Sequence, residues 1–372
     1  MCRTLAWWHI ATRRLSPVTG YRPVSRTACA ALTLVASVST PVFAQPQTTP
    51  RVDPSAPTST ITQVTVADLG IVTQAPVYIA MDRGYFEAEG LEANLVPART
   101  TAEIATLAAT GQVDFGGIAP DPALFNAMER GIQIKLLATG GVFDQSLTGA
   151  SGIVVRQDLI DSGRYRGFAD LKGFKIAVSS VQSQFYVEQI LQHAGLTAAD
   201  VDFTTLALPD MAAGLKGQAI DAAWMVEPLL GAMRAQDLGK QVASGFDAMP
   251  GGVSWLVFAG TTATGRDADI EARFMHAYIR GLRDFHHAFG LKDTSPDPVL
   301  DALAAHSSIQ DRGILEHVGM HPVNPNGTLD IASLDRYQDF YIAQGFQNQR
   351  IDLSRYVNSG PLDTALASLG WF

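Results

Sequence analysis

Cysteine is nearly missing from this sequence of 372 residues, which contains only Cys2 and Cys29. Both lie in an N-terminal segment that we predict to be cleaved off. The remaining chain would then have no disulfide, no thiolate metal ligand and no cysteine nucleophile. Cys29 also precedes an apolar run instead of following it, which is the wrong side for lipid attachment, so a lipoprotein is disfavoured.

Long hydrophobic runs are missing as well. The run at residues 28–38 is far shorter than the roughly 20 residues that a membrane-spanning helix needs. Five arginines and no acidic residue precede this run, and a small-residue cleavage motif ends at Ala44. This is the pattern of a secretory signal peptide. We therefore expect a signal peptide over residues 1–44, cleaved after Ala44, and a periplasmic protein instead of a membrane-anchored one.

Positive charge is in deficit, with 27 lysines and arginines against 36 aspartates and glutamates. Loss of the five arginines in the signal segment makes the balance more acidic still. Such a charge disfavours nucleic acid and anionic membrane surfaces as partners.

Enzyme motifs are absent too. The sequence has no G-x-S-x-G elbow, no H-E-x-x-H or comparable histidine spacing, and no glycine-rich phosphate loop. The adjacent His286 and His287 would point about 100° apart on a helix and could not share a metal well. We expect no catalytic residues, no metal and no cofactor.

The segment at residues 45–60 is rich in proline and poor in large apolar residues, so we expect a flexible leader. The remainder, residues 61–372, is too long for one small core and suits two lobes.

Strand-like segments alternate with helical patterns along this remainder. Helix starts are indicated by Thr100 with Glu103 in a capping box, by Asp121 before a proline, and by Ser180 or Ser183. The alternation predicts an α/β fold in which each lobe is a mostly parallel sheet flanked by helices. We expect the shorter helices of residues 297–346 to cover the first lobe. The expected strands are residues 61–67, 93–96, 113–118, 132–138, 153–156, 175–178, 201–207, 219–226 and 255–260.

Ligands of open α/β sheets bind outside the carboxyl ends of the strands, beside helix N-termini. The loops there are rich in Gly, Ser, Thr and Gln, which suits neutral hydrogen bonds to a small polar ligand. Thr100, Asp121 and Ser183 are each explained more simply as helix caps. Glu227 is either a first-turn carboxylate or an acceptor for a ligand N–H. The candidate residues without an evident structural role are Gln74, Gln182 and Trp255. The loops concerned are residues 70–75, 98–101, 117–121, 179–183 and 226–228.

Two glycine pairs, Gly140-Gly141 and Gly251-Gly252, flank the predicted second lobe. Their permissive backbone suits a hinge. Two chain crossings near these pairs predict a clamp that closes.

Four motifs resemble one family of periplasmic binding proteins, those for taurine, alkanesulfonates, nitrate and thiamine-pyrimidine precursors. They occur in the family's order and span most of the mature chain. The motifs are MDRGYFEAEGL at residues 81–91, GQVDFG at 111–116, DLKGFKIAV at 170–178 and DAAWMVEP at 221–228.

The resemblance implies a type II periplasmic-binding fold. Lobe one would comprise residues 61–145 and 253–372, and lobe two residues 146–252. It also implies delivery of a solute to ABC permease subunits, and we expect a monomer. The family's ligand loops, carried over by motif position, fall at Gln74, at Thr100 and Thr101, at residues 118–121 and 179–183, and at Glu227. Within the two ranges the candidate ligand residues are Ala119, Asp121, Ser179, Ser180, Gln182 and Ser183.

Two other functions stay open. The same fold occurs in a fungal enzyme that makes the thiamine pyrimidine, although that enzyme depends on a cysteine-rich motif that the mature chain lacks. The chain could also be the ligand-binding subunit of a sensor. Arg99 is the one fixed cation of the loops, and Asp121 and Glu227 would repel a bare anion. We therefore expect an uncharged, zwitterionic or amine-bearing solute, sulfonate-like as taurine is or heterocyclic.

Overall fold

The computed structural model describes residues 61–147, 149–266 and 268–372. The predicted signal peptide, its cleavage after Ala44 and the predicted leader at residues 45–60 lie outside the described residues.

The first sheet has five strands in the order β2-β1-β3-β10-β4. β1 pairs in parallel with β2 and β3, whereas β10 runs antiparallel to β3 and β4. The first residues of β10 therefore lie at the edge where the other strands end. The bounds are β1 (Thr62–Asp68), β2 (Leu91–Pro97), β3 (Phe115–Ile118), β4 (Lys135–Val142) and β10 (Val253–Ala259).

The second sheet repeats this plan in the order β7-β6-β8-β5-β9. β6 is parallel to β7 and β8, and β5 is antiparallel to β8 and β9. The start of β5 therefore lies beside the end of β8. The bounds are β5 (Ser151–Arg156), β6 (Lys175–Val178), β7 (Asp202–Thr205), β8 (Ala222–Val226) and β9 (Gly239–Ser244).

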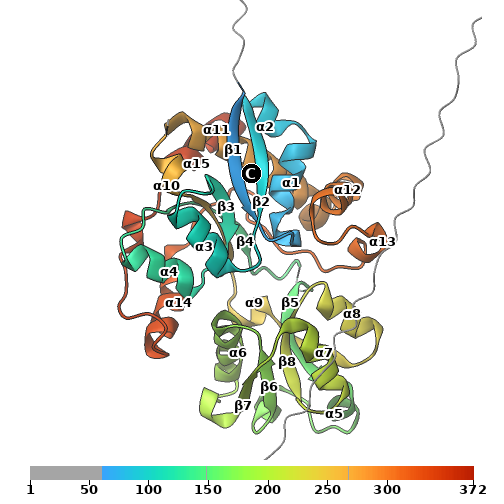
Figure 1. Cartoon of the computed structure of the whole chain (residues 1–372). Coiled ribbons are helices and arrows are strands. Elements are labelled where there is room, and N and C mark those ends of the chain that lie inside the picture. The colour runs from blue at the N-terminus through green and yellow to red at the C-terminus, as the bar shows by residue number, and fades with distance from the viewer. Residues whose placement is uncertain (1–60, 148, 267) are drawn as a thin grey trace, which may run out of the picture. The chain divides into compact units, whose positions relative to one another are not determined.

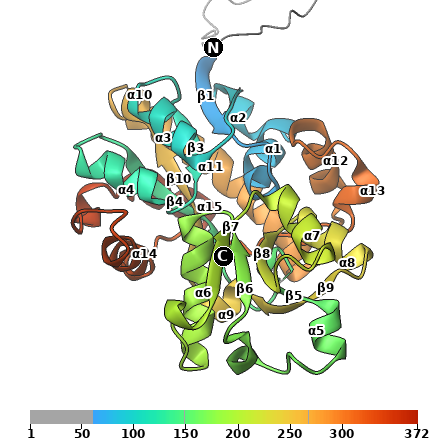
Figure 2. The ribbon, with the colours of Figure 1, turned by 60° about the horizontal axis from the view of Figure 1, so that its bottom comes forward.

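Helices cover both faces of each sheet, because neighbouring buried residues of the central strands point to opposite faces. In the first sheet, Leu256 packs toward α3 and α4, whereas its neighbour Val257 packs toward α1 and α11. In the second sheet, Trp224 packs toward α6, and Met225 packs toward α7 and α8. Figures 1 and 2 show α6 on one side of β6 and β8 and α7 on the other. The α/β prediction of two lobes is confirmed, but each sheet is mixed, because β10 in the first and β5 in the second run antiparallel to both of their neighbours.

The α-helices are α1 (Ala75–Asp82), α2 (Tyr85–Ala88), α3 (Thr101–Ala109), α4 (Pro122–Glu129), α5 (Gln157–Asp161), α6 (Val181–His193), α7 (Leu208–Lys216), α8 (Leu229–Ala235), α9 (Gly245–Ala248), α10 (Thr261–Thr264), α11 (Ala268–Phe285), α12 (Asp297–His306), α13 (Arg312–Leu315), α14 (Ile331–Ala343) and α15 (Gly360–Leu369). Short 3₁₀ turns are η1 (Val72–Gln74), η2 (Phe168–Leu171), η3 (Ala198–Asp200) and η5 (Leu353–Arg355), and η4 (His286–Leu291) is π-helical.

The predicted cap residues do cap their helices, but the capping box predicted for Thr100 is only half formed, because the Glu103 carboxylate accepts from the Arg99 N–H instead of the Thr100 N–H. The Thr100 hydroxyl accepts a hydrogen bond from the Glu103 N–H, and the Asp121 carboxylate accepts one from the Ala123 N–H. We predicted that either Ser180 or Ser183 caps α6. Both do, because together they form the capping box of this helix.

Three sequence expectations need correction. The strand predicted at residues 132–138 is shifted to Lys135–Val142, because the Ile132 N–H instead bonds the Ala127 carbonyl and closes the end of α4. β9 was not predicted, since this edge strand carries polar side chains such as Lys240. α14 does not cover the first lobe alone, because it packs against α6 as well as α4.

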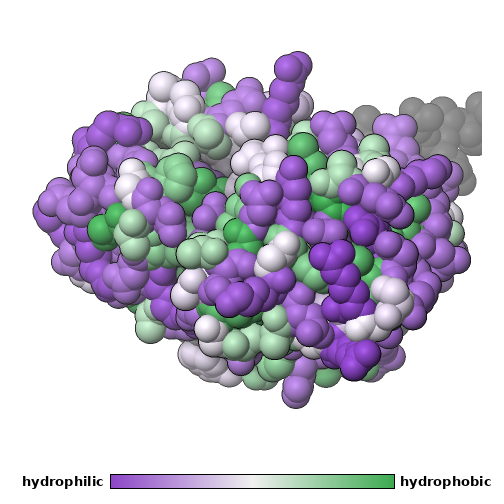
Figure 3. Space-filling model, turned by 90° about the horizontal axis from the view of Figure 1, so that it is seen from below, coloured by the Kyte–Doolittle hydropathy of each residue, from purple (hydrophilic) through white to green (hydrophobic). Residues whose placement is uncertain are grey.

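The chain passes between the sheets twice, after Val142 and again before Val253. Of the lobe boundaries that we predict, 145/146 lies between β4 and β5, and 252/253 lies at the start of β10. No helix within residues 61–147, 149–266 and 268–372 combines the length and apolar character needed to cross a membrane. On the face shown in Figure 3, hydrophilic residues cover most of the surface, and hydrophobic residues lie between them in small groups.

Candidate functional site

A cavity of about 290 Å³ lies where the carboxyl ends of strands from both sheets meet. The first sheet contributes the loop after β1 and the beginning of β10, and the second contributes the loops after β6 and β8. This is the position expected for a ligand of open α/β sheets. The lining residues are Leu69, Ile71, Val72, Thr73, Thr101, Ala119, Phe143, Ala150, Ser151, Ser179, Ser180, Gln182, Ser183, Tyr186, Trp224, Val226, Glu227, Ser254, Trp255 and His321.

Aromatic rings form much of the wall. The ring centroids of Tyr186 and Trp224 lie 4.9 Å apart, and Phe143 meets Tyr186 edge-on at 5.1 Å. Trp255 lines the cavity from β10, and Gly117 leaves room for it: a methyl group there would lie 2.2 Å from the Trp255 Nε1. Such walls suit a flat apolar or aromatic ligand body.

Eight of the predicted ligand residues line this cavity: Thr101, Ala119, Ser179, Ser180, Gln182, Ser183, Glu227 and Trp255. These residues differ in whether their side chains already make hydrogen bonds within the protein. The Ser183 hydroxyl accepts from the N–H groups of Ser179 and Ser180 and donates to the Ser180 carbonyl, which makes it a structural clamp. The side chains of Thr101, Ser179 and Gln182 make no hydrogen bond to another described residue, and so they remain available.

Glu227 is held by its own helix start. Its carboxylate accepts from the Gly231 N–H at 2.8 Å and pairs with Arg234, and its side chain is only 1% exposed. Burial raises the pKa of this carboxyl, while the Gly231 N–H and the Arg234 charge act in the opposite direction. We expected Glu227 to be either a first-turn carboxylate or an acceptor for a ligand N–H. The geometry favours the first of these, a structural carboxylate at the start of α8.

Three predicted residues do not line the cavity. Thr100 and Asp121 cap α3 and α4. Gln74 is buried and donates to the Ala67 carbonyl and the Asp68 carboxylate, so the interpretation that it lacks a structural role is wrong. Its Oε1 lies over Gly117 beside the Trp255 indole, and Gln74 thus supports the wall from behind.

The sequence reasoning missed several lining residues. Tyr186 looked like helix core and Trp224 like buried strand, because their apolar spacing is that of ordinary packing. Thr73 lay inside a predicted loop without being singled out. Ser254 and His321 carried no signal at all.

The predicted hinge glycines have identifiable structural roles. Gly140 and Gly141 lie inside β4 instead of in the crossing, which begins after Val142. A methyl group at Gly140 would lie 2.9 Å from the Trp255 Cδ1, so the pair makes room for cavity residues. Gly251 adopts φ +69° in the turn before β10, a conformation that favours glycine.

The cavity offers little to attract an anion. Among its described lining residues there is no lysine or arginine. Arg99, the one cation that we expected near the ligand, is exposed and not among them. Burial lowers the pKa of His321, so its imidazole is neutral at pH 7.

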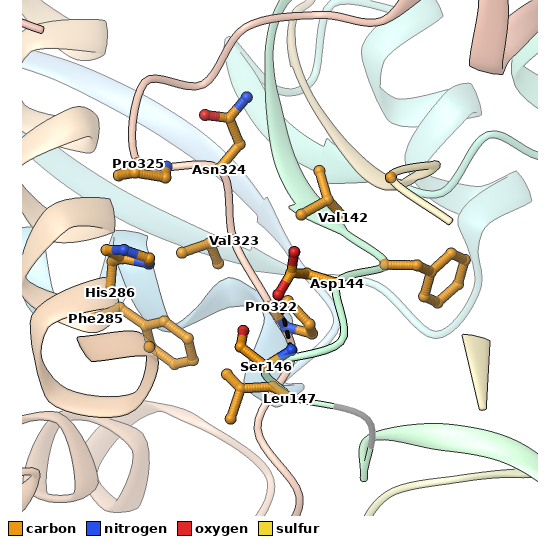
Figure 4. Close-up of a pocket in the computed structure, with 13 residues that line it drawn as sticks. Val142, Asp144, Ser146, Leu147, Phe285, His286, Pro322, Val323, Asn324 and Pro325 are labelled. Atoms are coloured by element: carbon orange, nitrogen blue, oxygen red, sulfur yellow. Dashed lines mark hydrogen bonds between the residues drawn. The ribbon is translucent and has the colours of Figure 1, made fainter. Parts of the chain in front are cut away.

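A second cavity of about 400 Å³ shares Phe143 with the first. Figure 4 shows Phe285 and His286 on one side of it and Val142 and Asp144 on the other, with the segment at residues 322–325 between them. The Ser146 N–H and hydroxyl hold the pKa of Asp144 below its usual value. Because Asp144 and Ser146 are exposed and no strand of the second sheet reaches this cavity, we place the candidate site in the first.

The fold is similar to that of known binding proteins. The periplasmic nitrate-binding protein NrtA of Synechocystis PCC 6803 superposes with a TM-score of 0.65 at 12% identity, over 83% of this chain and 89% of that one. The periplasmic aliphatic sulphonate binding protein SsuA of Escherichia coli gives 0.64 at 15% identity, over 79% of this chain and 97% of that one. At these identities the likeness establishes the fold alone.

Sequence comparison points to a related group. The 4-amino-5-hydroxymethyl-2-methylpyrimidine phosphate synthase of Aspergillus parasiticus is 29% identical over 131 residues, which are 34% of each protein. The chain thus spans about a third of the length of the curated relatives it matches. A family model described as "NMT1/THI5 like" matches residues 72–287, more than half of the chain and most of the cavity lining. The chain therefore belongs to the NMT1/THI5-like family.

Proposed function

We propose that this protein is the extracytoplasmic solute-binding component of an ABC importer, and that it captures a small aromatic heterocycle or a similar uncharged or amine-bearing solute. The observation that carries the proposal is the cavity between the ends of strands from two sheets, with side chains of both sheets in its wall. The predicted signal peptide and the fold shared with two periplasmic binding proteins support it.

The shape of the cavity supports a compact solute. Its volume of about 290 Å³ is at the lower end of the range for ligand pockets. Tyr186, Trp224 and Trp255 offer ring faces and edges for stacking, which is worth about 0.5–1.5 kcal/mol for each aromatic pair beyond burial. A single heterocyclic ring that bears polar substituents would use both the rings and the hydroxyls.

The charges support an uncharged or amine-bearing solute over an inorganic anion. A sulfonate or nitrate would enter a cavity without a lysine or arginine in its described lining and with the Glu227 carboxylate in its wall. Backbone N–H groups at the start of α6 could still donate to an anion, but the faces of the aromatic rings carry negative partial charge and would not attract it.

An enzyme that makes a pyrimidine is the second candidate, because the curated relatives carry that name. Against it, no cysteine occurs after Cys29, and the family resemblance ties the fungal activity to a cysteine-rich motif. A sensor subunit would use the same cavity and would differ only in its membrane partner.

Native mass spectrometry of the protein purified from its own cells tests the proposal directly. We expect a bound heterocycle that is released intact on unfolding. Calorimetric titration should then show binding of 4-amino-5-hydroxymethyl-2-methylpyrimidine and no binding of nitrate or ethanesulfonate. Tight binding of either anion, with none of the heterocycle, would contradict the solute class. Conversion of the bound molecule by the purified protein would favour the enzyme.

A further inference from the structure

Two hydroxyls in the cavity wall have no protein partner. The Oγ of Ser254 and the Oγ1 of Thr73 are buried, and neither makes a hydrogen bond to another described residue. Both residues line the cavity, and Ser254 as a whole is only 8% exposed. A buried polar group that lacks a hydrogen bond destabilises the folded protein, because it has lost its bonds to water without replacing them. Two such groups at the same cavity therefore need an explanation.

The backbone around Ser254 is shaped to bring its side chain to the cavity. Val253 pairs with Val142 and Trp255 with Gly141, so β10 carries one more residue than β4 at this point. In a regular strand Ser254 and Trp255 would face opposite sides of the sheet, yet both line the cavity. Such a bulge commonly re-aims a side chain beside a functional site.

The neighbours of Ser254 complete a polar end of the cavity. A methyl group at Gly141 would lie 2.9 Å from the Ser254 Oγ and 3.3 Å from the His321 Nδ1, so these two side chains approach the same glycine. The His321 Nδ1 lies 3.1 Å from the Pro322 carbonyl. Because a carbonyl can only accept, Nδ1 carries the proton, and Nε2 of the neutral ring is an acceptor.

We propose that the Ser254 and Thr73 hydroxyls are kept without protein partners so that they bind the solute, and that they select a solute with a hydrogen-bonding group on the side facing the first sheet. This inference rests on the proposed function and names the residues that set its specificity. Hydroxyls both donate and accept, so an amino, hydroxyl or ring-nitrogen group would satisfy them. An apolar ring of the same shape would leave both unpaired.

The test uses two variants and a matched control. Ser254→Ala and Thr73→Val remove the hydroxyls with little change of shape. Ser333→Ala removes a buried hydroxyl that has a partner, since the Ser333 Oγ accepts from the Val253 N–H at 2.8 Å. Affinity is measured by calorimetry with 4-amino-5-hydroxymethyl-2-methylpyrimidine, and stability by urea unfolding of the ligand-free protein.

We expect Ser254→Ala and Thr73→Val to bind the probe about 3- to 10-fold more weakly, as for the loss of one hydrogen bond. Neither should lower the midpoint of urea unfolding, and Ser254→Ala should raise it. Ser333→Ala should do the reverse, with a lower midpoint and a similar affinity. Wild-type affinity in both cavity variants would overturn the inference, and so would a fall in the midpoint as large as that of Ser333→Ala.

The two proposals fail in distinguishable ways. If the wild-type protein does not bind the probe, the proposed solute class is wrong. Urea unfolding of the variants then still tests whether the two hydroxyls lack a hydrogen-bond partner in the folded protein. A higher midpoint in Ser254→Ala supports a group kept unpaired, and a lower one contradicts it.

Discussion

The hydroxyls of Tyr186 and Tyr337 share a hydrogen bond of 2.8 Å that joins α6, which covers the second sheet, to α14. Tyr337 donates its own proton to the Val253 carbonyl at 2.7 Å, so Tyr186 must be the donor between the two rings. Val253 begins β10 and directly precedes Ser254. These two hydrogen bonds form a relay from Tyr186 through Tyr337 to Val253. The relay therefore connects one ring of the cavity wall to the bulge on the opposite side.

The two phenols of this relay should differ in their effect on stability. Tyr337→Phe leaves the Val253 carbonyl and the Tyr186 hydroxyl without their partner, and we expect a loss of about 1–3 kcal/mol in the free energy of unfolding. Tyr186→Phe leaves the Tyr337 bond to Val253 in place and should cost less. Urea unfolding of both variants is the measurement. A larger loss in Tyr186→Phe would mean that the donor direction assigned here is wrong.

Substitutions of Gln182 and Leu191, which both lie on α6, should affect different properties, the first ligand binding and the second stability. Gln182 lines the cavity without a hydrogen bond to another described residue, whereas Leu191 is fully buried in the core. Gln182→Ala should weaken binding of the pyrimidine probe about 3- to 10-fold and leave stability unchanged. Leu191→Ala should lower the free energy of unfolding by about 2–5 kcal/mol, while the folded fraction binds normally. Unchanged affinity in Gln182→Ala would remove it from the site.

Gly117 should tolerate no side chain. A methyl group there would lie 2.2 Å from the Trp255 Nε1 and 2.6 Å from the Gln74 Oε1, and both side chains are buried. We expect Gly117→Ala to displace the Trp255 ring, to lower the free energy of unfolding by about 1–3 kcal/mol and to weaken probe binding. Gly167→Ala is the control, since nothing lies within 4 Å of its added methyl group. Equal behaviour of the two variants in calorimetry and urea unfolding would contradict this packing.

The sequence predicted which loops surround the cavity, but it did not predict all of the side chains that line it. Ser179, Gln182 and Trp255 could be found because strand ends and helix starts follow short-range rules, and the rules place them at one edge. Ser254 could not be found, since it faces the cavity only because of a bulge that depends on pairing with a distant strand. His321 lies in a segment without secondary structure, more than 60 residues after β10 begins, and only tertiary packing brings it to the cavity.

The errors in the fold have the same origin. Gln74 was predicted to have no structural role, and Gly140 was predicted to be a hinge residue, because no residue near either of them in the sequence indicates a packing or hydrogen-bonding role. The structure uses Gln74 to bond the end of β1, and it uses Gly140 to make room for Trp255. β9 was missed because an edge strand buries only part of its residues, so its apolar pattern is weak.

His321 should make the protein less stable in mild acid. Burial holds its pKa below the value of 6.5 that it has in the unfolded chain. The unfolded chain therefore binds a proton first, and stability falls as the pH drops below about 6.5 toward the pKa of the folded state. His321→Gln should make the decline in urea-unfolding midpoint between pH 7 and pH 5 shallower. An unchanged decline in His321→Gln would show that His321 takes up its proton equally well in the folded protein, and it would contradict the neutral acceptor assigned to the cavity.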